Sequence, residues 1–325
     1  MPTVTLRNRR SFSADESEIL LDAALRQGVV LEHSCRTGRC GVCIADATGT
    51  TRVVRHEEGL SDEDAQAGKV LTCCRTAVDD VELGVESLDR LAGLRSKILP
   101  CRIGRLERHS DDLLVATLRL PPTLPLKFLP GQHVNVIHGA VRRSYSLANA
   151  PRADNTVELH IRRYPGGVMS AYWFEQAAVG DLLRLEGPLG TFFLREMSCE
   201  RLLLLCTGTG IAPAKAMLEE IAAAGSPFPP TTLIWGNRTR LDFNWDPSQV
   251  AMPIEFIPVL SRPDATWSGA TGYVQHQIEA LDTSMEGVDV YACGSNDMIA
   301  DLGALLKSSG HPEHRFYYDA FVRSQ

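Results

Sequence analysis

Four cysteines of this 325-residue chain are spaced as the ligands of an iron–sulfur cluster. Cys35, Cys40 and Cys43 follow the spacing C-x4-C-x2-C, and Cys73 comes after 29 intervening residues. Four thiolates with this spacing hold the two irons of a [2Fe–2S] cluster. Zinc sites with four cysteines usually consist of two closely spaced pairs, which is not the pattern here. The sequence therefore predicts a [2Fe–2S] cluster, with zinc as the alternative.

Two glycines and one neighbouring cysteine refine this prediction. Gly38 and Gly41 would supply backbone angles that other residues avoid, and they would let backbone N–H groups approach the sulfurs of the cluster. Cys74 directly follows Cys73 in an expected strand over residues 70–74, where adjacent side chains point to opposite faces. We expect Cys73 to be the ligand and Cys74 to be a small buried side chain, and the reverse assignment stays open.

A cluster of this kind transfers single electrons, so the rest of the chain should hold the groups that supply them. The stretch Arg142–Ser146 offers an arginine that could clamp a phosphate, an aromatic face and serine hydroxyls. Further along, Gly166 and Gly167 precede an expected helix over residues 170–178, and a helix N-terminus favours phosphate. Each pattern alone also fits an ordinary strand or turn. Both together, behind a cysteine cluster, favour a phosphate-bearing cofactor.

A second glycine loop follows a strand that the sequence predicts to be buried. Residues 202–206 are continuously apolar, and the loop Gly208–Pro213 leads into an expected helix that ends at Ala224. The loop departs from the dinucleotide fingerprint G-x-G-x-x-G, because Pro213 stands in place of the last glycine.

The elements around these motifs change in type along the chain. Residues 3–10, 11–13 and 17–27 are expected to form strand, strand and helix, the beginning of a ferredoxin-type β-grasp domain. From residue 101 to 192, short alternating segments separated by Pro and Gly predict an antiparallel barrel. From residue 201, strands alternate with helices, including one expected over 272–281, which predicts a doubly wound α/β domain. We expect domains over 1–90, 101–196 and 197–325, with a linker over 91–100.

Composition limits the classes of function. A chain that is 44% hydrophobic and 22% charged, with no apolar run near twenty residues, predicts a soluble protein without a membrane span. The N-terminus lacks the pattern of a secretory signal, and nine cysteines favour metal binding in a reducing, cytoplasmic compartment over disulfides. The net charge of −7 disfavours nucleic acid as a partner.

Taken together, these motifs resemble those of the ferredoxin–NADP reductase superfamily. The resemblance implies a multidomain α+β chain: a plant-type [2Fe–2S] ferredoxin β-grasp, an antiparallel β-barrel that binds FAD and a doubly wound α/β domain that binds NAD(P)H. It implies that FAD is bound by two segments, made of Arg143, Ser144, Tyr145, Ser146 and of Gly167, Val168, Met169, Ser170. It implies that the nicotinamide dinucleotide is bound by Gly208, Thr209, Gly210, Ile211, Ala212, Pro213, Cys293, Gly294 and Ser295.

The resemblance also assigns roles at the flavin. Ser146 and Cys293 would align the hydride step, and Phe321 would cover the flavin, with Tyr318 as the alternative. Thr207 stands where much of the superfamily has a glycine, a variant that should leave the turn intact.

Within the superfamily, the chain looks most like the CDP-6-deoxy-3,4-glucoseen reductases of dideoxyhexose biosynthesis. The stretches that carry this likeness are Leu71–Cys74, Leu118–Pro122, Arg142–Pro151, Glu186–Phe193 and Asp319–Val322. We expect electrons to pass from NADH to FAD, to the [2Fe–2S] cluster and to a partner, a sugar 3-dehydratase. The alternative partner is the oxygenase component of a Rieske dioxygenase or diiron monooxygenase. NADPH is the alternative donor, since Arg238 and Arg240 could meet a 2′-phosphate.

Overall fold

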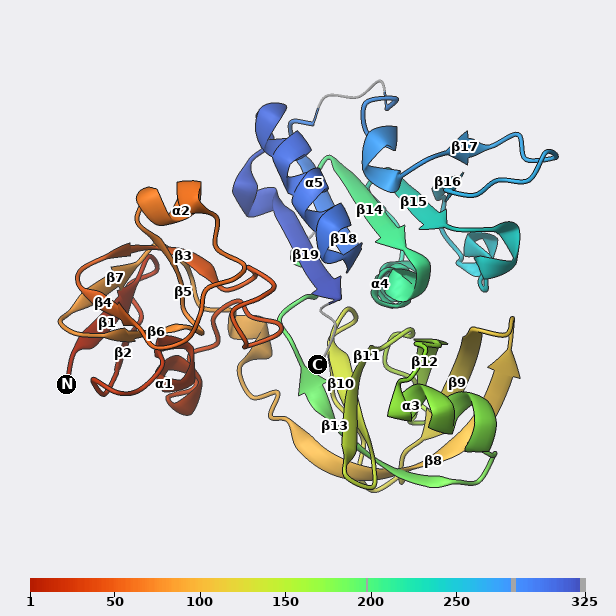
Figure 1. Ribbon diagram of the computed structural model, residues 1–325, viewed down its shortest axis with the longest axis horizontal. Coiled ribbons are helices and arrows are strands. Elements are labelled where there is room, and N and C mark those ends of the chain that lie inside the picture. The colour runs from red at the N-terminus through yellow and green to blue at the C-terminus, as the bar shows by residue number, and fades with distance from the viewer. Residues whose placement is uncertain (197, 282–284, 322–325) are drawn as a thin grey trace. The chain divides into compact units, whose positions relative to one another are not determined.

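The chain forms two compact units in a computed structural model, which describes residues 1–196, 198–281 and 285–321 (Figure 1). The first unit contains Met1–Leu94, Gly190–Phe192 and Phe321, and the second contains Arg95–Leu189 and Phe193–Ala320. The chain therefore returns to the first unit for three residues long after leaving it.

The first unit is a small mixed sheet that holds a helix. Its five-stranded sheet has the order β2-β1-β7-β3-β5, and β4 and β6 form a separate pair. The strands are β1 (Thr3–Leu6), β2 (Ser11–Ser13), β3 (Ile44–Thr48), β4 (Thr51–Val53), β5 (Lys69–Leu71), β6 (Arg75–Ala77) and β7 (Val81–Leu83). The helices are α1 (Leu20–Arg26), α2 (Asp62–Gln66) and the 3-10 turn η1 (Asp89–Leu91). Helix α1 buries one face in the apolar core of this unit, as its expected amphipathic pattern requires.

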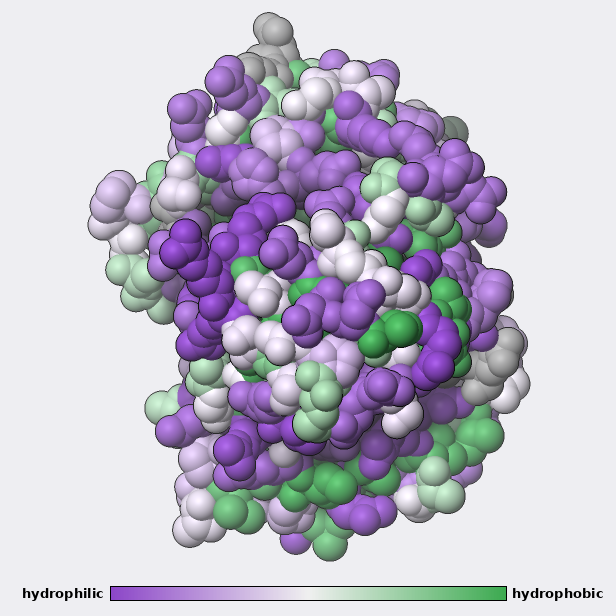
Figure 2. Space-filling model, turned by 90° about the vertical axis from the view of Figure 1, so that its left-hand side faces the viewer, coloured by the Kyte–Doolittle hydropathy of each residue, from purple (hydrophilic) through white to green (hydrophobic). Residues whose placement is uncertain are grey.

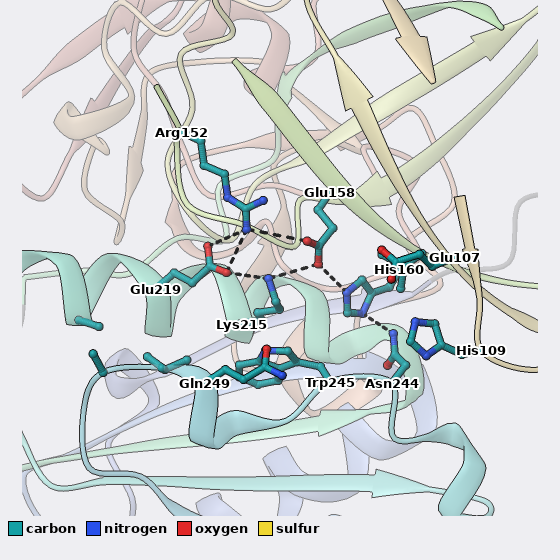
Figure 3. Close-up of a pocket in the computed structure, with 14 residues that line it drawn as sticks. Glu107, His109, Arg152, Glu158, His160, Lys215, Glu219, Asn244, Trp245 and Gln249 are labelled. Carbon is teal, nitrogen blue, oxygen red and sulfur yellow. Dashed lines mark hydrogen bonds and ion pairs between the residues drawn. The ribbon is translucent and has the colours of Figure 1, made fainter. Parts of the chain in front are cut away.

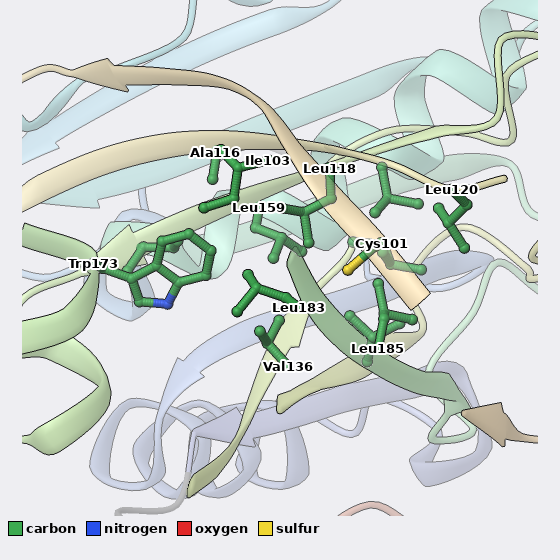
Figure 4. Close-up of a cluster of buried hydrophobic side chains, with 14 of the residues drawn as sticks. Cys101, Ile103, Ala116, Leu118, Leu120, Val136, Leu159, Trp173, Leu183 and Leu185 are labelled. Atoms are coloured by element: carbon green, nitrogen blue, oxygen red, sulfur yellow. The ribbon is translucent and has the colours of Figure 1, made fainter. Parts of the chain in front are cut away.

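The second unit begins with an antiparallel barrel. Its strands lie in the order β11-β10-β13-β8-β9-β12, and a bridge between Leu147 and Leu159 joins the two ends. The strands are β8 (Lys97–Arg108), β9 (Leu113–Arg119), β10 (His133–His138), β11 (Val141–Ser146), β12 (Thr156–Arg162) and β13 (Leu182–Leu189). Alternate residues point inward, and Figure 4 shows Ile103, Leu118 and Leu159 packed together in this core.

The same unit continues as a six-stranded sheet with the order β17-β16-β15-β14-β18-β19, parallel from β17 to β18. The strands are β14 (Arg201–Thr207), β15 (Thr231–Asn237), β16 (Glu255–Leu260), β17 (Ala270–Thr271), β18 (Val288–Ser295) and β19 (Phe316–Phe321). The helices are α4 (Ile211–Ala224) and α5 (Asn296–Ser308), with 3-10 turns η3 (Gly208–Gly210), η4 (Arg240–Asp242), η5 (Pro247–Gln249), η6 (Val274–Gln277) and η7 (Glu313–Arg315).

The strand order of this sheet reverses between β14 and β18. The chain runs outward from β14 through β15 and β16, then returns to the other side of β14 as β18. Ligands of doubly wound sheets bind beyond the carboxyl ends of the strands at such a switch point. The ends of β14 and β18 are Thr207 and Ser295, beside the two segments that the sequence predicts to bind a dinucleotide.

The predicted fold class is confirmed, and several boundaries differ. The helix expected over 170–178 is one α-turn, α3 (Val168–Ala171), followed by the π-helix η2 (Tyr172–Gln176). The helix expected over 272–281 is only the 3-10 turn η6, which begins after Gly272, with a φ of +94°, and Tyr273, whose backbone is extended. Strand β8 begins at Lys97, inside the expected linker. None of the described helices is long and apolar enough to cross a membrane. On the face in Figure 2, hydrophobic residues are scattered among hydrophilic ones.

Candidate functional site

The four spaced cysteines meet in the first unit as two pairs. The thiols of Cys35 and Cys40 hydrogen-bond to each other, which lowers the pKa of Cys35 to about 4 and raises the pKa of Cys40. A hydrogen bond with Cys43 likewise lowers the pKa of Cys73, to about 7. Among the described residues, no three or more His, Cys, Asp or Glu side chains lie close enough together to hold one metal ion. Two pairs fit a two-iron cluster, in which each iron takes two cysteines, better than they fit one zinc ion.

Backbone geometry brings the loop close to these sulfurs. Gly38 has a φ of +81°, and a Cβ there would lie 2.3 Å from the carbonyl oxygen of His56 and 2.7 Å from Cys74 Sγ. Thr37 N–H donates to Cys35 Sγ at 3.4 Å, and the backbone N–H of Gly38 acts on Cys73. Such N–H groups tune the potential of a cluster. The loop therefore fits a [2Fe–2S] cluster.

Cys73 and Cys74 lie in a turn after β5, not in the strand that the sequence predicts. The N–H of Cys74 donates to the carbonyl of Leu71 at 2.8 Å, which closes the turn, so the argument from opposite faces of a strand does not apply. The two sulfurs are 3.6 Å apart. Their other neighbours differ, because Cys73 pairs with Cys43 whereas Cys74 approaches the carbonyl of His56.

The two loop arginines are held by acids of the same unit. Arg36 Nη2 lies 2.5 Å from Asp22 Oδ1, and Arg39 Nε lies 3.2 Å from Glu58 Oε2. Both pairs are partly exposed. The surface beside the cluster thus presents alternating charges.

The β10–β11 hairpin positions the Arg-Arg-Ser-Tyr-Ser segment. Ser144 Oγ donates to Asn135 Oδ1 at 2.7 Å, and Asn135 Nδ2 donates to Glu186 Oε2 at 2.8 Å. Glu186 also pairs with Arg142 at 3.0 Å. Arg143 and Tyr145 alternate with these residues along β11, so they point to the other side of the hairpin.

A tryptophan that the sequence did not single out holds the predicted flavin tyrosine. Trp173 Nε1 donates to the hydroxyl of Tyr145 at 3.0 Å, and the two rings meet edge to face with centroids 6.3 Å apart. Burial raises the pKa of Tyr145. Trp173 lies in the π-helix η2, and such insertions are frequent at functional sites. The contact joins residues 28 positions apart, so no local pattern could have indicated it.

The predicted phosphate segment is a tight turn before α3. Gly166 has a φ of +73°, and Gly167 is the residue that precedes the helix. Ser170 Oγ accepts from Tyr164 N–H at 2.9 Å, so this hydroxyl closes the turn. Met169 is buried, whereas Val168 is exposed at the surface.

The glycines of the dinucleotide loop permit a close backbone contact. A Cβ at Gly210 would lie 2.2 Å from the carbonyl oxygen of Cys293, and one at Gly294 would lie 2.1 Å from Thr207 Oγ1. Thr207 itself is extended, with φ −124° and ψ 133°, so this position does not need a glycine. The carboxyl ends of β14 and β18 therefore meet closely enough for one ligand to contact both.

The remaining predicted dinucleotide residues lie at the same edge of the sheet. Thr209 is in η3, and Ile211, Ala212 and Pro213 form the buried first turn of α4. Ser295 Oγ accepts from Met298 N–H at 3.3 Å and so caps α5. Burial, followed by the charge of Asp319, raises the pKa of Cys293 well above its usual value, so this thiol is neutral.

The predicted C-terminal aromatic residues belong to β19. Phe321 ends the strand and is partly exposed, while the ring of Tyr318 packs on Phe316 with centroids 5.1 Å apart. Val322, the end of one stretch that carried the resemblance, lies outside the described residues.

Substitution of Gly210 tests the close contact at the switch point. We expect Gly210→Ala to weaken binding of the dinucleotide at least tenfold, because the β14 loop must move away from Cys293. Gly303→Ala is the matched control, since a Cβ there would lie 3.5 Å from Phe316, an ordinary contact. Titration calorimetry with NADH on both variants measures the difference, and equal dissociation constants would contradict the prediction.

Family models match all three parts of the chain. The 2Fe-2S iron-sulfur cluster binding domain matches residues 4–78, the oxidoreductase FAD-binding domain matches 100–194, and the oxidoreductase NAD-binding domain matches 204–303. Together they span most of the sequence in the predicted order.

Relatives and solved structures agree with these models. The chain is 36% identical to the CDP-6-deoxy-L-threo-D-glycero-4-hexulose-3-dehydrase reductase of Yersinia pestis over 97% of this chain and 96% of that protein. It is 33% identical to the toluate 1,2-dioxygenase electron transfer component of Pseudomonas putida, over 97% and 96%. The Amycolatopsis cytochrome P450 reductase GcoB matches with a TM-score of 0.75 and 27% identity over 99% of each chain.

The cysteine pairs, the barrel hairpin and the glycine loop thus occur in one chain whose full length matches such reductases. The chain belongs to the ferredoxin–NADP reductase-like family of [2Fe–2S], FAD and NAD(P)H oxidoreductases.

Proposed function

We propose that this NAD(P)H-dependent reductase takes electrons from NADH and delivers them to a sugar 3-dehydratase of dideoxysugar biosynthesis. The observation that carries the reductase function is the presence of three sites in one chain: two thiol pairs, the Arg142–Ser146 hairpin and the Gly208–Gly210 switch point. When bound, nicotinamide gives up two electrons as a hydride, flavin accepts them together and releases them singly, and a cluster carries one at a time.

The residues of the chain have positioning roles in this proposal. Arg143 and the Gly167–Ser170 turn would hold the FAD pyrophosphate, and Tyr145, fixed by Trp173, would pack on the flavin. Ser146 would lie at the reacting edge of the flavin, and Phe321 would cover it. None of these roles moves a proton at a titrating group, so we expect no general base.

The glycine loop and the end of β18 would hold the nicotinamide dinucleotide. Gly208–Pro213 would carry its pyrophosphate, and Cys293–Ser295 would lie beside the nicotinamide. The raised pKa of Cys293 keeps this thiol neutral, which suits contact with an uncharged ring that donates hydride.

We propose the domain limits 1–90, 101–196 and 197–325, joined by residues 91–100. The three family matches support this division. All nine cysteines of the chain are free thiols, which supports a reducing compartment such as the cytoplasm.

The proposed preference for NADH over NADPH follows the resemblance to the reductases, and the surroundings of Arg240 support it. The guanidinium of Arg240 lies 5.0 Å above the ring of Trp267 and 3.4 Å from Asp264 Oδ2, so an acid already faces it. That acid would repel a 2′-phosphate. We expect kcat/KM to be at least tenfold higher with NADH than with NADPH in steady-state assays, and Asp264→Asn to narrow the gap. Equal values for the two nucleotides in the unchanged protein would contradict this preference.

The ligand assignment of the cysteines has a direct test. We expect Cys73→Ser to lose the visible bands and most of the iron of the cluster, because Cys73 pairs with Cys43. Cys74→Ser should keep both, since the thiol of Cys74 approaches the carbonyl of His56 at 3.6 Å, whereas the thiol that pairs with Cys43 is that of Cys73. Iron analysis and absorbance spectra of the purified variants distinguish the two assignments, and the opposite result would make Cys74 the ligand.

Reconstitution identifies the acceptor. The likeness to hexulose-3-dehydrase reductases supports the dehydratase, whereas the likeness to the toluate dioxygenase component supports an oxygenase as the second candidate. With NADH present, we expect the protein to support C-3 deoxygenation of a CDP-hexulose by the dehydratase and to support oxygenase turnover at least tenfold more slowly. A purified protein without flavin and iron–sulfur absorbance would overturn the reductase function itself.

A further inference from the structure

A buried lysine joins the barrel to the α/β part of the second unit. Lys215 lies one turn into α4, and its residue is only 5% exposed. Removing an ammonium group from water is unfavourable unless hydrogen bonds and opposite charges compensate for it. The partners of Lys215 therefore indicate what this position requires.

Those partners come from both parts of the unit (Figure 3). Lys215 Nζ donates to the carbonyl of Ala148 at 2.8 Å and to Glu219 Oε1 at 2.6 Å, and it lies 3.2 Å from Glu158 Oε1. Glu219 is four residues further along α4, while Ala148 and Glu158 belong to the barrel. The second oxygen of Glu219 accepts from Ala150 N–H at 3.0 Å, so α4 contacts the 148–150 segment twice.

Glu158 is ionised and fixed on the barrel side. Burial raises the pKa of Glu158, but the hydrogen bond with His160 and the charge of Lys215 outweigh this effect and lower the pKa to about 2. His160 Nε2 lies 3.0 Å from Glu158 Oε1, and Asn244 Nδ2 lies 3.1 Å from His160 Nδ1. Asn244 follows η4 in the α/β part, so it adds a second link between the two parts.

These links connect the two segments that would carry the hydride donor and the hydride acceptor. Lys215 is on the helix that begins directly after the Gly208–Gly210 loop. Ala148 is two residues after Ser146, at the end of the flavin hairpin. The network lies beside a pocket of about 510 Å³, and its cations are already paired with carboxylates, so it does not offer a free anion site.

We propose that Lys215 is a positioning residue for hydride transfer, which sets the separation of the dinucleotide loop from the flavin hairpin through Ala148 and Glu158. The proposal rests on the proposed function. Hydride transfer depends steeply on how closely donor and acceptor are held, and a misplacement of about 1 Å can slow such a step about 100-fold. Folding stability alone does not account for the ion pair between Lys215 and Glu158, because replacing a buried ion pair by apolar groups often leaves the stability of a protein unchanged.

Two variants and a control separate positioning from folding. Lys215→Met removes the ammonium but keeps both carboxylates, so that Arg152, 3.3 Å from Glu219 and 3.8 Å from Glu158, is left to balance two negative charges, an excess that alone can destabilise the site. Lys215→Met combined with Glu158→Gln removes one positive and one negative charge, and Glu219 keeps Arg152 as its partner at 3.3 Å, so this variant avoids that cost. Lys127→Met makes the same chemical change at an exposed position of the barrel and should behave as the unchanged protein.

The readouts are FAD content, amide hydrogen exchange and hydride transfer. We expect the double variant to retain FAD and, without NADH, to exchange the amide hydrogens of residues 147–150 faster than the unchanged protein. In stopped flow with saturating NADH, its flavin should be reduced at least tenfold more slowly. The deuterium isotope effect with 4-deuterated NADH should increase, while electron transfer from dithionite to the cluster should not change.

Other outcomes overturn the proposal. One such outcome is a double variant whose rate of flavin reduction and isotope effect equal those of the unchanged protein. Another is a rate of flavin reduction that falls only in proportion to the loss of bound FAD. If the unchanged protein and the Lys127→Met control are not reduced by NADH at all, the proposed function fails. In that case, unchanged amide exchange at 147–150 in the double variant would still contradict the coupling, and faster exchange would support it.

Discussion

The cluster loop and the dinucleotide loop both depend on a close approach of neighbouring segments. Glycine permits this approach because it has no side chain. Gly38 lies against the carbonyl of His56, and Gly210 lies against the carbonyl of Cys293. At Gly294 the neighbour is the hydroxyl of Thr207. A side chain at any of these positions would separate segments distant in sequence. Glycine at these positions therefore lets the cysteine thiols lie close enough together to bind one cluster, and the ends of two strands close enough to bind one dinucleotide.

Features encoded by short-range spacing could be predicted from the sequence. The C-x4-C-x2-C loop and the strand before Gly208 depend on residues that are near one another along the chain. The three-part order followed from the same local patterns. The β-branched and apolar residues around Cys73 and Cys74 predict a strand, but they also fit a turn, which the structure forms where Thr72 contacts the cysteine loop.

The supporting residues could not be predicted, because their roles depend on long-range contacts. Trp173, in the π-helix η2, reaches Tyr145 across 28 positions of sequence, and Lys215 reaches Ala148 across 67. In the sequence, a lysine in a helix of alanines predicts a solvated side chain. Its burial becomes evident only when the barrel is placed against α4. Motifs in the sequence therefore indicate candidate site residues, whereas the residues that hold these candidates in place become evident only from the structure.

The short return of the chain to the first unit affects how such reductases can be recombined. Thr191 Oγ1 donates to the carbonyl of His33 at 2.7 Å and accepts from the N–H of His33 at 2.7 Å, although 158 positions separate them. A gene fragment that ends at Leu94 encodes the cluster unit without this partner. Because Gly190–Phe192 belongs to the same compact unit as Met1–Leu94, an exchange of the complete cluster unit between reductases includes this segment.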